Sequence, residues 1–260
     1  MNEAYNIDCM EYNKIYNTDC IRGMKEIPDN SVDLIVTDPP YIMNKTSGSP
    51  TSCSMQEKWQ GNLKAGDKTA NIINTIKFKD WLPDVYRILK NDSHCYIWVN
   101  DKNLSDLQVE AENVGFRLHN ILVWKKNNCT PNRWYMKNCE FILFLHKGKS
   151  FPISNLGDSQ LYECQNINGK DKLHPTQKPL DYTKRLILNS SEDGDIVFDP
   201  FTGSGTTAVA CINTNRNYID FELSEEYCKI AEERIKRALE ERYQARVAQQ
   251  SLFIGQEECV

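Results

Sequence analysis

The sequence predicts an α/β fold: a three-layer sandwich with a mainly parallel, seven-stranded sheet and an antiparallel hairpin at one edge. Three observations support this class. Short β-branched runs alternate with amphipathic stretches, this alternation continues along most of the chain, and one pair of strands is joined by a polar loop without a helix. Strands that are separated by helices pair in parallel and are covered on both faces. The 260 residues, of which 40% are hydrophobic, suffice for one large domain with a sizeable core.

Seven segments have the β-branched, apolar composition that is typical of strands. They are Lys14–Asn17, Val32–Thr37, Cys95–Val99, Leu118–Trp124, Phe141–His146, Ile196–Phe198 and Tyr218–Phe221. Helical periodicity fits six further segments. They are Cys20–Ile27, Phe78–Leu89, Lys102–Val114, Leu180–Ser190, Thr206–Ile212 and Ser224–Arg246. Ser224 is expected to cap the last helix.

We expect residues 1–246 to form a single domain with three polar insertions, at 42–77, 125–138 and 148–172, and residues 247–260 to be a C-terminal tail. The first insertion is rich in Ser, Thr, Asn, Gly and Lys and has no sustained period. A loop of that length is too long for a plain connection in a compact domain and is usually functional or disordered.

Composition narrows the function classes. The ten cysteines form no Cys-x-x-Cys pair, so we expect reduced thiols and no metal site. No stretch approaches the roughly 18 apolar residues of a membrane span. The first ten residues also lack the basic-then-apolar pattern of a signal peptide. A cytoplasmic location is therefore expected.

The first chemical motif is Asp38-Pro39-Pro40-Tyr41, directly after the apolar strand Val32–Thr37. Ligands of open α/β sheets bind at the carboxyl ends of strands. The two prolines have no N–H donors, which leaves carbonyl acceptors beside a carboxylate and an aromatic ring. A planar exocyclic amine could donate hydrogen bonds to Asp38 and the Pro39 carbonyl while its ring stacks on Tyr41, as a flipped nucleobase requires. The alternative is a tight proline turn with a buried tyrosine.

The second motif is a glycine-rich turn, Asp199-Pro-Phe-Thr-Gly-Ser-Gly-Thr206, between a strand and a helix. Gly203 and Gly205 allow the backbone to approach a ligand closely. Glu222 lies 19 residues after Gly203, at the end of the next strand, where an acidic residue conventionally holds ribose hydroxyls. Taken alone, this pattern also fits a nicotinamide-dependent oxidoreductase, or a turn without any ligand.

Together, the two motifs and His174-Pro-Thr-Gln-Lys-Pro179 resemble the beta group of S-adenosylmethionine-dependent DNA amino-methyltransferases, over residues 15–235. In that family the catalytic motif precedes the cofactor motif, and this chain has the same order. The resemblance implies a permuted Rossmann-like methyltransferase fold that binds S-adenosylmethionine and double-stranded DNA. Family members are frequently dimers, so a homodimer is also expected.

Carried over residue by residue, the resemblance places Asp38, Pro39, Pro40 and Tyr41 in the catalytic pocket. It places eleven residues at the cofactor: Asp19, Thr176, Lys178, Asp199, Pro200, Phe201, Gly203, Ser204, Gly205, Thr206 and Glu222. Asp19 would lie near the adenine, Thr176 and Lys178 near the methionine carboxylate, and Glu222 at the ribose. Asp19 has an alternative role as the N-cap of the helix that begins at Cys20.

The implied reaction moves a methyl group from S-adenosylmethionine to the N6 amino group of a flipped adenine by direct displacement. Family members that act on cytosine N4 often have Ser where this chain has Asp38, so adenine is favoured and cytosine N4 is the alternative. Methylation of cytosine carbon-5 requires a Pro-Cys dipeptide in the corresponding family, and none of the ten prolines here precedes a cysteine. An inactive DNA-binding relative is a further alternative.

Basic residues gather in one window although the whole chain carries a net charge of −5. Residues 125–149 contain six Lys and Arg residues and a single acidic one. The candidate DNA-binding residues in this window are Lys125, Lys126, Arg133, Trp134 and Lys137. Cations, amides and an aromatic side chain together suit phosphate and base contacts. A solvated hairpin tip is the alternative. In the family a recognition segment lies between the hairpin and His174, where this chain has only about 25 residues. The insertions 42–77 and 148–172 are also expected to contact DNA, and the first of them, or a second subunit, to share the sequence readout.

The C-terminal peptide Gln249-Gln-Ser-Leu-Phe253 resembles the short segment by which bacterial DNA-maintenance proteins bind the replication sliding clamp. Gln249, Leu252 and Phe253 would make the clamp contacts. The alternative is that the apolar Leu252 and Phe253 pack onto the body of the protein.

Overall fold

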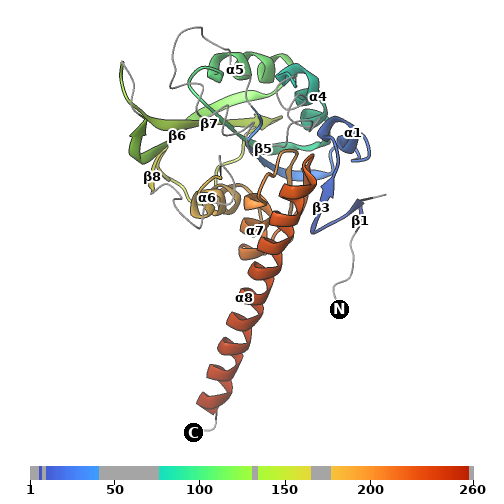
Figure 1. Cartoon of the computed structure of the whole chain (residues 1–260), viewed down its shortest axis with the longest axis vertical. Helices are drawn as coiled ribbons and strands as arrows, with labels where there is room; N and C mark the ends of the chain where they lie inside the picture. The colour runs from blue at the N-terminus through green and yellow to red at the C-terminus, as the bar shows by residue number, and fades with distance from the viewer. Residues whose placement is uncertain (1–5, 8–9, 41–75, 131–133, 165–176, 258–260) are drawn as a thin grey trace.

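Eight strands form one sheet in the computed structural model, which describes residues 6–7, 10–40, 76–130, 134–164 and 177–257 (Figure 1). Their order across the sheet is β3-β10-β9-β4-β5-β7-β6-β8. The strands are β3 (Lys14–Asn17), β4 (Val32–Thr37), β5 (Leu89–Val99), β6 (Arg117–Thr130), β7 (Lys137–Lys147), β8 (Leu161–Cys164), β9 (Ile196–Asp199) and β10 (Asn217–Glu222). A separate short hairpin joins β1 (Asn6–Ile7) to β2 (Met10–Glu11).

The sheet is mainly parallel, as the sequence predicts. Strands β3, β10, β9, β4 and β5 run parallel, whereas β7 is antiparallel to both β5 and β6. The predicted hairpin is not the edge, however, because β8 pairs in parallel with β6 along Val123–Lys126. This eighth strand was missed in the segment expected to be an insertion. It has four residues of alternating exposed and half-buried character, with Leu161 exposed, so its sequence carries no clear apolar period.

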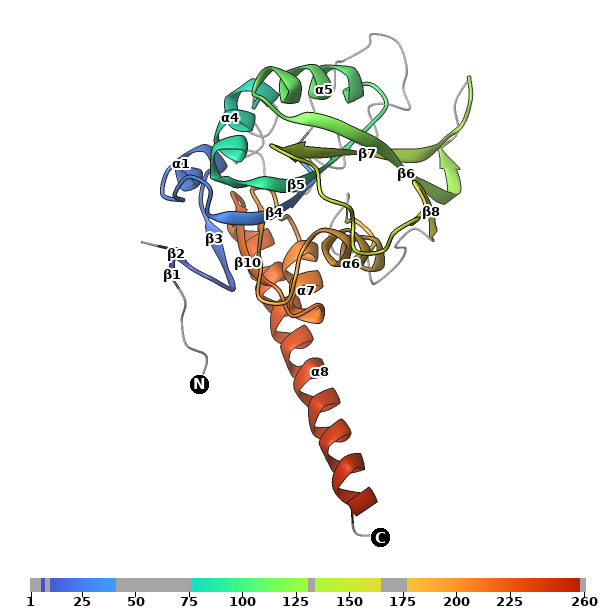
Figure 2. The same ribbon diagram turned by 180° about the vertical axis from the view of Figure 1, so that it is seen from behind.

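Helices cover both faces of the sheet, which confirms the three-layer arrangement (Figure 2). One face carries α1 (Cys20–Met24), α4 (Phe78–Ile88) and α5 (Leu104–Asn113), and the other carries α6 (Leu180–Ser190), α7 (Thr206–Asn213) and α8 (Glu225–Glu257). Each layer buries its own apolar cluster. Trp81 belongs to the first cluster, and Tyr182 to the second. Both side chains are fully buried.

Buried cations satisfy the carbonyl groups at several helix ends. Lys147 donates to the carbonyls of Tyr86 (2.8 Å) and Leu89 (2.6 Å), where α4 ends. Arg216 donates to the hydroxyl (3.0 Å) and the carbonyl (2.5 Å) of Ser191, which caps the carboxyl end of α6. The last turn of a helix leaves carbonyls unpaired, so a nearby cation stabilises it. These contacts lie near the amino ends of the strands and leave the opposite edge of the sheet for ligands.

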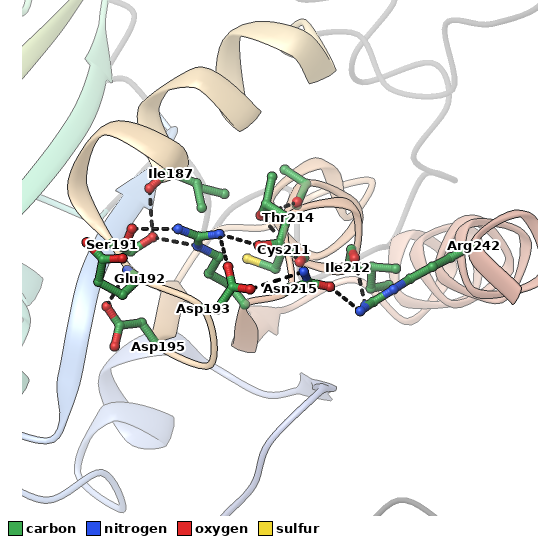
Figure 3. A network of polar contacts seen from close by, with 12 residues as sticks. Ile187, Ser191, Glu192, Asp193, Asp195, Cys211, Ile212, Thr214, Asn215 and Arg242 are labelled. Atoms are coloured by element: carbon green, nitrogen blue, oxygen red, sulfur yellow. Dashed lines mark hydrogen bonds and ion pairs between the residues drawn. The ribbon is translucent and has the colours of Figure 1, made fainter. Parts of the chain in front are cut away.

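Helix α8 is fastened to the body by Arg242, which donates to the carbonyl of Ile212 (2.9 Å) and to the side chain of Asn215 (Figure 3). From Tyr243 to Gln250 every residue is exposed, and this part of the helix runs away from the sheet (Figure 1). The helix continues to Glu257, beyond the end predicted at Arg246. Residues 247–257 of the expected C-terminal tail are therefore helical, because good helix formers such as Ala and Gln continue past Arg246.

Among the described residues, no helix combines the length and the apolar character that crossing a membrane requires. In the same part of the chain, His, Cys, Asp and Glu side chains do not gather into a group that could hold a metal ion.

Candidate active site

The two sequence motifs meet where the direction of chain crossing reverses. Strands β4 and β9 are neighbours in the sheet, paired at Leu34 with Val197 and at Ile35 with Phe198. From β4 the chain proceeds to β5 on one side, and from β9 it proceeds to β10 on the other. Such a reversal opens a crevice at the carboxyl ends of the two strands. Asp38 directly follows β4, and Asp199 is the last residue of β9.

Fourteen described residues line this crevice. They are Val36, Thr37, Asp38, Trp98, Gln177, Lys178, Thr183, Asp199, Phe201, Thr202, Gly203, Ser204, Thr206 and Thr207. The lining therefore brings together the predicted catalytic carboxylate and most of the predicted cofactor residues. Pro39, Pro200 and Gly205 are buried beside it, and Pro40 is half-buried. Tyr41, Thr176 and Arg133 lie outside the described residues.

Asp199 holds the base of the crevice together. One oxygen accepts from the Thr37 hydroxyl (2.6 Å) and from the backbone N–H of Phe201 (3.0 Å), and the other accepts from the Thr207 hydroxyl (2.7 Å). Complete burial raises the pKa of Asp199 to about 6, although these hydrogen bonds oppose the change. The carboxylate thus ties β4, the glycine-rich turn and α7 to one another.

The glycine-rich turn has the left-handed backbone that the sequence predicts. Gly203 and Gly205 have φ values of 56° and 76°, which residues other than glycine rarely adopt. A Cβ atom on Gly205 would also lie 2.8 Å from the Cβ of Ala231 on α8. The turn therefore needs glycine at position 205 both for its backbone angle and for the close approach of α8.

Arg234 on α8 supports the turn from behind and was missed in the sequence analysis. Its guanidinium donates to the Ser204 carbonyl (2.5 Å), the Ser204 hydroxyl (2.9 Å) and the Thr206 hydroxyl (3.2 Å). Burial lowers the pKa of Arg234 to about 10. Because Arg234 lies in a helix with many charged residues, its sequence neighbourhood looks like an ordinary solvated surface.

Glu222 stands at the end of β10, as predicted. One of its oxygens accepts from the backbone N–H of Gly203 (3.0 Å) and the other from that of Ser224 (2.8 Å). Burial raises the pKa of Glu222 to about 7 despite these hydrogen bonds. Asp19, by contrast, caps α1 by accepting from the backbone N–H of Arg22 (3.1 Å). This contact is the alternative role considered for Asp19, and neither Asp19 nor Glu222 is among the crevice-lining residues.

Lys178 lines the crevice, and its ammonium group contacts two carboxylates there. Its ammonium group lies 2.7 Å from Asp38 Oδ2 and 3.0 Å from Glu140 Oε2. Glu140 comes from β7, and its other oxygen accepts from Lys126 on β6. Sequence reasoning missed Glu140 because it belongs to no motif and was counted only as the single acidic residue of a basic window.

The hairpin β6–β7 extends past the carboxyl ends of the parallel strands, on the same side of the sheet as Asp38. Strand β6 runs antiparallel to β7 and therefore parallel to β5, so its carboxyl end points toward the crevice edge. Near the tip, Trp134, Tyr135 and Met136 are 82%, 97% and 59% exposed. The neighbouring lysines are paired with carboxylates: Lys125 with Glu163, Lys126 with Glu140 and Lys137 with Asp101. The local positive charge is thus smaller than the sequence window indicates.

An open α/β sheet, a glycine-rich turn and an acidic residue at the next strand end define a Rossmann-like protein that binds a ligand at its switch point. A family model for DNA methylases matches residues 32–233, which span both motifs. Type II methyltransferase M2.MboI of Moraxella bovis is 32% identical over 238 residues, which cover 85% of this chain and 86% of that protein.

Two solved structures share the fold. The M1.HpyAVI–SAM complex has a TM-score of 0.66 at 25% identity, covering 85% of this chain and 98% of that one. PvuII DNA methyltransferase (cytosine-N4-specific) has a TM-score of 0.66 at 19% identity, with 85% of each chain covered. The chain belongs to the family of adenine-N6 and cytosine-N4 DNA methyltransferases, whose methyl donor is S-adenosylmethionine. The oxidoreductase alternative is wrong, because the family match accounts for the glycine-rich turn and the Asp38 motif together.

Proposed function

We propose that this protein transfers a methyl group from S-adenosylmethionine to the N6 amino group of a flipped adenine in double-stranded DNA. The observation that carries the proposal is that the carboxylate of Asp38 and the glycine-rich turn face one crevice at the β4–β9 switch point. An amine held by the carboxylate would meet a methyl donor held by the turn.

The residues present suit the cofactor. Gly203 has no side chain to block the approach of a ligand, and Ser204 and Thr206 line the same crevice. Each oxygen of Glu222 has accepted one backbone N–H and can accept a further hydrogen bond, which suits two ribose hydroxyls. When bound, S-adenosylmethionine supplies an activated methyl group on a sulfonium sulfur. Asp19 would lie near the adenine of the cofactor, and Thr176 near its methionine carboxylate.

Asp38 and Pro39 would orient the target base. The carboxylate and the Pro39 carbonyl accept the amine hydrogens, which directs the nitrogen lone pair toward the methyl group. Tyr41 would stack on the base. Because the enzyme holds the amine and the methyl donor in line, the entropy cost of bringing them together is met on binding, and positioning supplies most of the rate enhancement. The transfer is direct, so no covalent enzyme intermediate is needed.

Cytosine N4 is the second candidate target. The cytosine-N4-specific PvuII enzyme has the same fold, so the fold itself does not choose between the two amines. The aspartate at position 38 favours adenine. Incubation with isotopically labelled S-adenosylmethionine and unmethylated bacterial DNA, followed by mass spectrometry of the nucleosides, tests the choice. Labelled 6-methyladenine is expected, whereas labelled N4-methylcytosine would overturn the assignment of the base and keep the mechanism.

The hairpin tip is proposed to contact the DNA. Trp134, Tyr135 and Met136 present an exposed, largely apolar surface at the crevice edge, flanked by Lys125 and Lys137. Apolar side chains of this kind wedge between base steps and unstack them, which a flipped target base requires. The carboxylates that pair with these lysines are exposed, so phosphate groups can compete for the same cations.

Two protein partners are also proposed. Gln249 is exposed in the last part of α8, and we propose that the peptide 249–253 binds the sliding clamp. Replacing Leu252 and Phe253 by Ala should abolish clamp pull-down without lowering activity on short duplexes, and unchanged pull-down would discard the idea. A homodimer stays a prediction, to be measured by light scattering in solution.

A further inference from the structure

We propose that Lys178 is a positioning residue that keeps the Asp38 carboxylate charged and fixed in orientation, and that Glu140 is a positioning residue that holds Lys178 in place for this contact. The inference rests on the proposed catalytic role of Asp38 and extends it to two residues that lie in other elements of the fold. Lys178 lies two residues before α6 begins at Leu180, and Glu140 lies in β7 at the base of the hairpin.

Four charged groups alternate in sign across the base of the hairpin. Asp38 contacts Lys178, Lys178 contacts Glu140, and Glu140 contacts Lys126. The first two separations are 2.7 Å and 3.0 Å between nitrogen and oxygen. The Lys178 ammonium therefore engages Oδ2 of Asp38 and restrains rotation of that carboxylate.

Aromatic rings confine the two lysines. The Lys178 ammonium lies 5.1 Å from the ring centre of Trp98, and the Lys126 ammonium lies 4.9 Å from that of Trp124. The two indoles meet edge to face, with centres 5.8 Å apart. Cations are attracted to the faces of such rings, more strongly away from water. Lys178 is only 7% exposed, so its head group cannot turn to solvent as surface lysines do.

The network keeps Lys178 and Glu140 charged. Burial disfavours the ammonium form of Lys178, but the carboxylates of Asp38 and Glu140 outweigh burial and raise the pKa of Lys178. Burial likewise opposes ionisation of Glu140, yet the ammonium groups of Lys178 and Lys126 lower the pKa of Glu140. The charges of Lys178 and Glu140 are thus maintained by their neighbours, and the removal of one leaves the other buried with less compensation.

Charge at Asp38 matters for the reaction. As the nitrogen lone pair forms the bond to the methyl carbon, the carbon–sulfur bond breaks and its electrons go to sulfur. The amine becomes positively charged and then loses one proton to water. A carboxylate stabilises that positive charge, whereas a protonated carboxyl group does not. Lys178 would therefore extend the acidic limit of catalysis by holding Asp38 in its carboxylate form.

The test measures kcat against pH, with both substrates saturating, in full-length protein. Lys178→Met leaves Asp38 and Glu140 as neighbouring carboxylates without the cation between them. The acid limb of the kcat profile should move upward by about 1 to 3 pH units, the size expected when an adjacent opposite charge is lost. Adding Glu140→Gln to Lys178→Met removes one of the two carboxylates and should move the limb back down.

Glu140→Gln alone should lower kcat several-fold without moving the acid limb upward, because Lys178 still pairs with Asp38. Glu140→Gln would thus lower kcat in the wild type but restore the acid limb in the Lys178→Met variant. This opposite effect is a signature of charge coupling, which a purely structural role would not produce. Lys184→Met is the matched control, since it breaks the ion pair between the half-buried Lys184 and the exposed Asp181 in α6. The control should keep the wild-type profile.

The inference is overturned if the acid limb of Lys178→Met coincides with that of the wild type, or if Glu140→Gln does not restore it. Should Lys178→Met fail to fold, Lys178→Gln keeps a donor for Asp38 without the charge and serves the same test. Full methyl transfer by Asp38→Ala would instead refute the proposed function itself. If Asp38→Ala loses activity but the acid limb of Lys178→Met stays where it is in the wild type, only the role of Lys178 and Glu140 is refuted.

Discussion

Thr37 donates a 2.6 Å hydrogen bond to Asp199 and so joins two motifs that are 162 residues apart in the chain. Thr37 ends β4 directly before Asp38, and Asp199 ends β9 directly before the glycine-rich turn. The bond is buried at the base of the crevice. It couples the position of the proposed catalytic carboxylate to that of the proposed cofactor turn.

Thr37→Val should therefore weaken both stability and catalysis. The substitution keeps the shape of the side chain but leaves the buried Asp199 with one donor fewer, at a cost of about 1 to 3 kcal/mol. Denaturant unfolding measures that loss. Thr214→Val is the control, because Thr214 also donates from a buried hydroxyl, to the Ala210 carbonyl (2.7 Å), but outside the crevice. Equal kcat values for the two variants would contradict the coupling.

Asp38→Ala should lower kcat by about two orders of magnitude or more, because it removes a group proposed to act in the transition state. The affinity for S-adenosylmethionine should persist, since the glycine-rich turn is unchanged. Single-turnover methyl transfer and calorimetric cofactor binding separate the two effects. Retained turnover would show that Asp38 is not the catalytic carboxylate.

Glu222 makes cofactor binding dependent on pH. Burial raises the pKa of Glu222 to about 7, so the free enzyme carries a largely protonated Glu222 below that pH. If the carboxylate form accepts the ribose hydroxyls, binding must release this proton in acid. The affinity should then rise with pH, up to about tenfold per unit, and level off above the pKa. Glu222→Gln should bind more weakly and without this slope, as calorimetry at several pH values would reveal.

Arg234→Met should weaken cofactor binding by about tenfold, the effect of losing roughly 1.4 kcal/mol of support to the turn. The guanidinium donates hydrogen bonds to Ser204 and Thr206 from α8, whereas a methionine side chain fills similar space but has no donors. Arg237→Met, an exposed change in the same helix, is the comparison and should bind normally. Unaltered affinity in both variants would mean that the turn keeps its shape without Arg234.

Tyr135→Ala should raise KM for DNA while leaving S-adenosylmethionine binding unchanged, since Tyr135 is 97% exposed at the hairpin tip. If the ring assists unstacking, the defect should shrink on a duplex with an abasic site opposite the target base, where flipping costs less. Tyr243→Ala, at an exposed tyrosine of α8 and outside the predicted DNA-contacting segments, is the control. An equal defect on both duplexes would mean that Tyr135 only contacts the DNA.

Local patterns in the sequence determined much of the fold. The alternation of apolar strands and amphipathic helices predicted the three layers and the parallel sheet, because backbone hydrogen bonding and burial act on each segment separately. The Asp38 motif and the glycine-rich turn were recognised for the same reason, since each is a short run whose backbone demands are local. The short strand β8 lacks such a pattern, and it forms because β6 offers a free edge for pairing.

Only the tertiary structure decided which distant groups share the crevice. Nothing near Lys178 in the chain indicates that its ammonium lies between Asp38 and Glu140, or that Arg234 supports Ser204. Such contacts depend on the order of strands in the sheet and on how closely the helices pack against them. The types of residue that perform the chemistry are therefore legible in the sequence, whereas their electrostatic partners arise from long-range packing, which brings charges together irrespective of their separation along the chain.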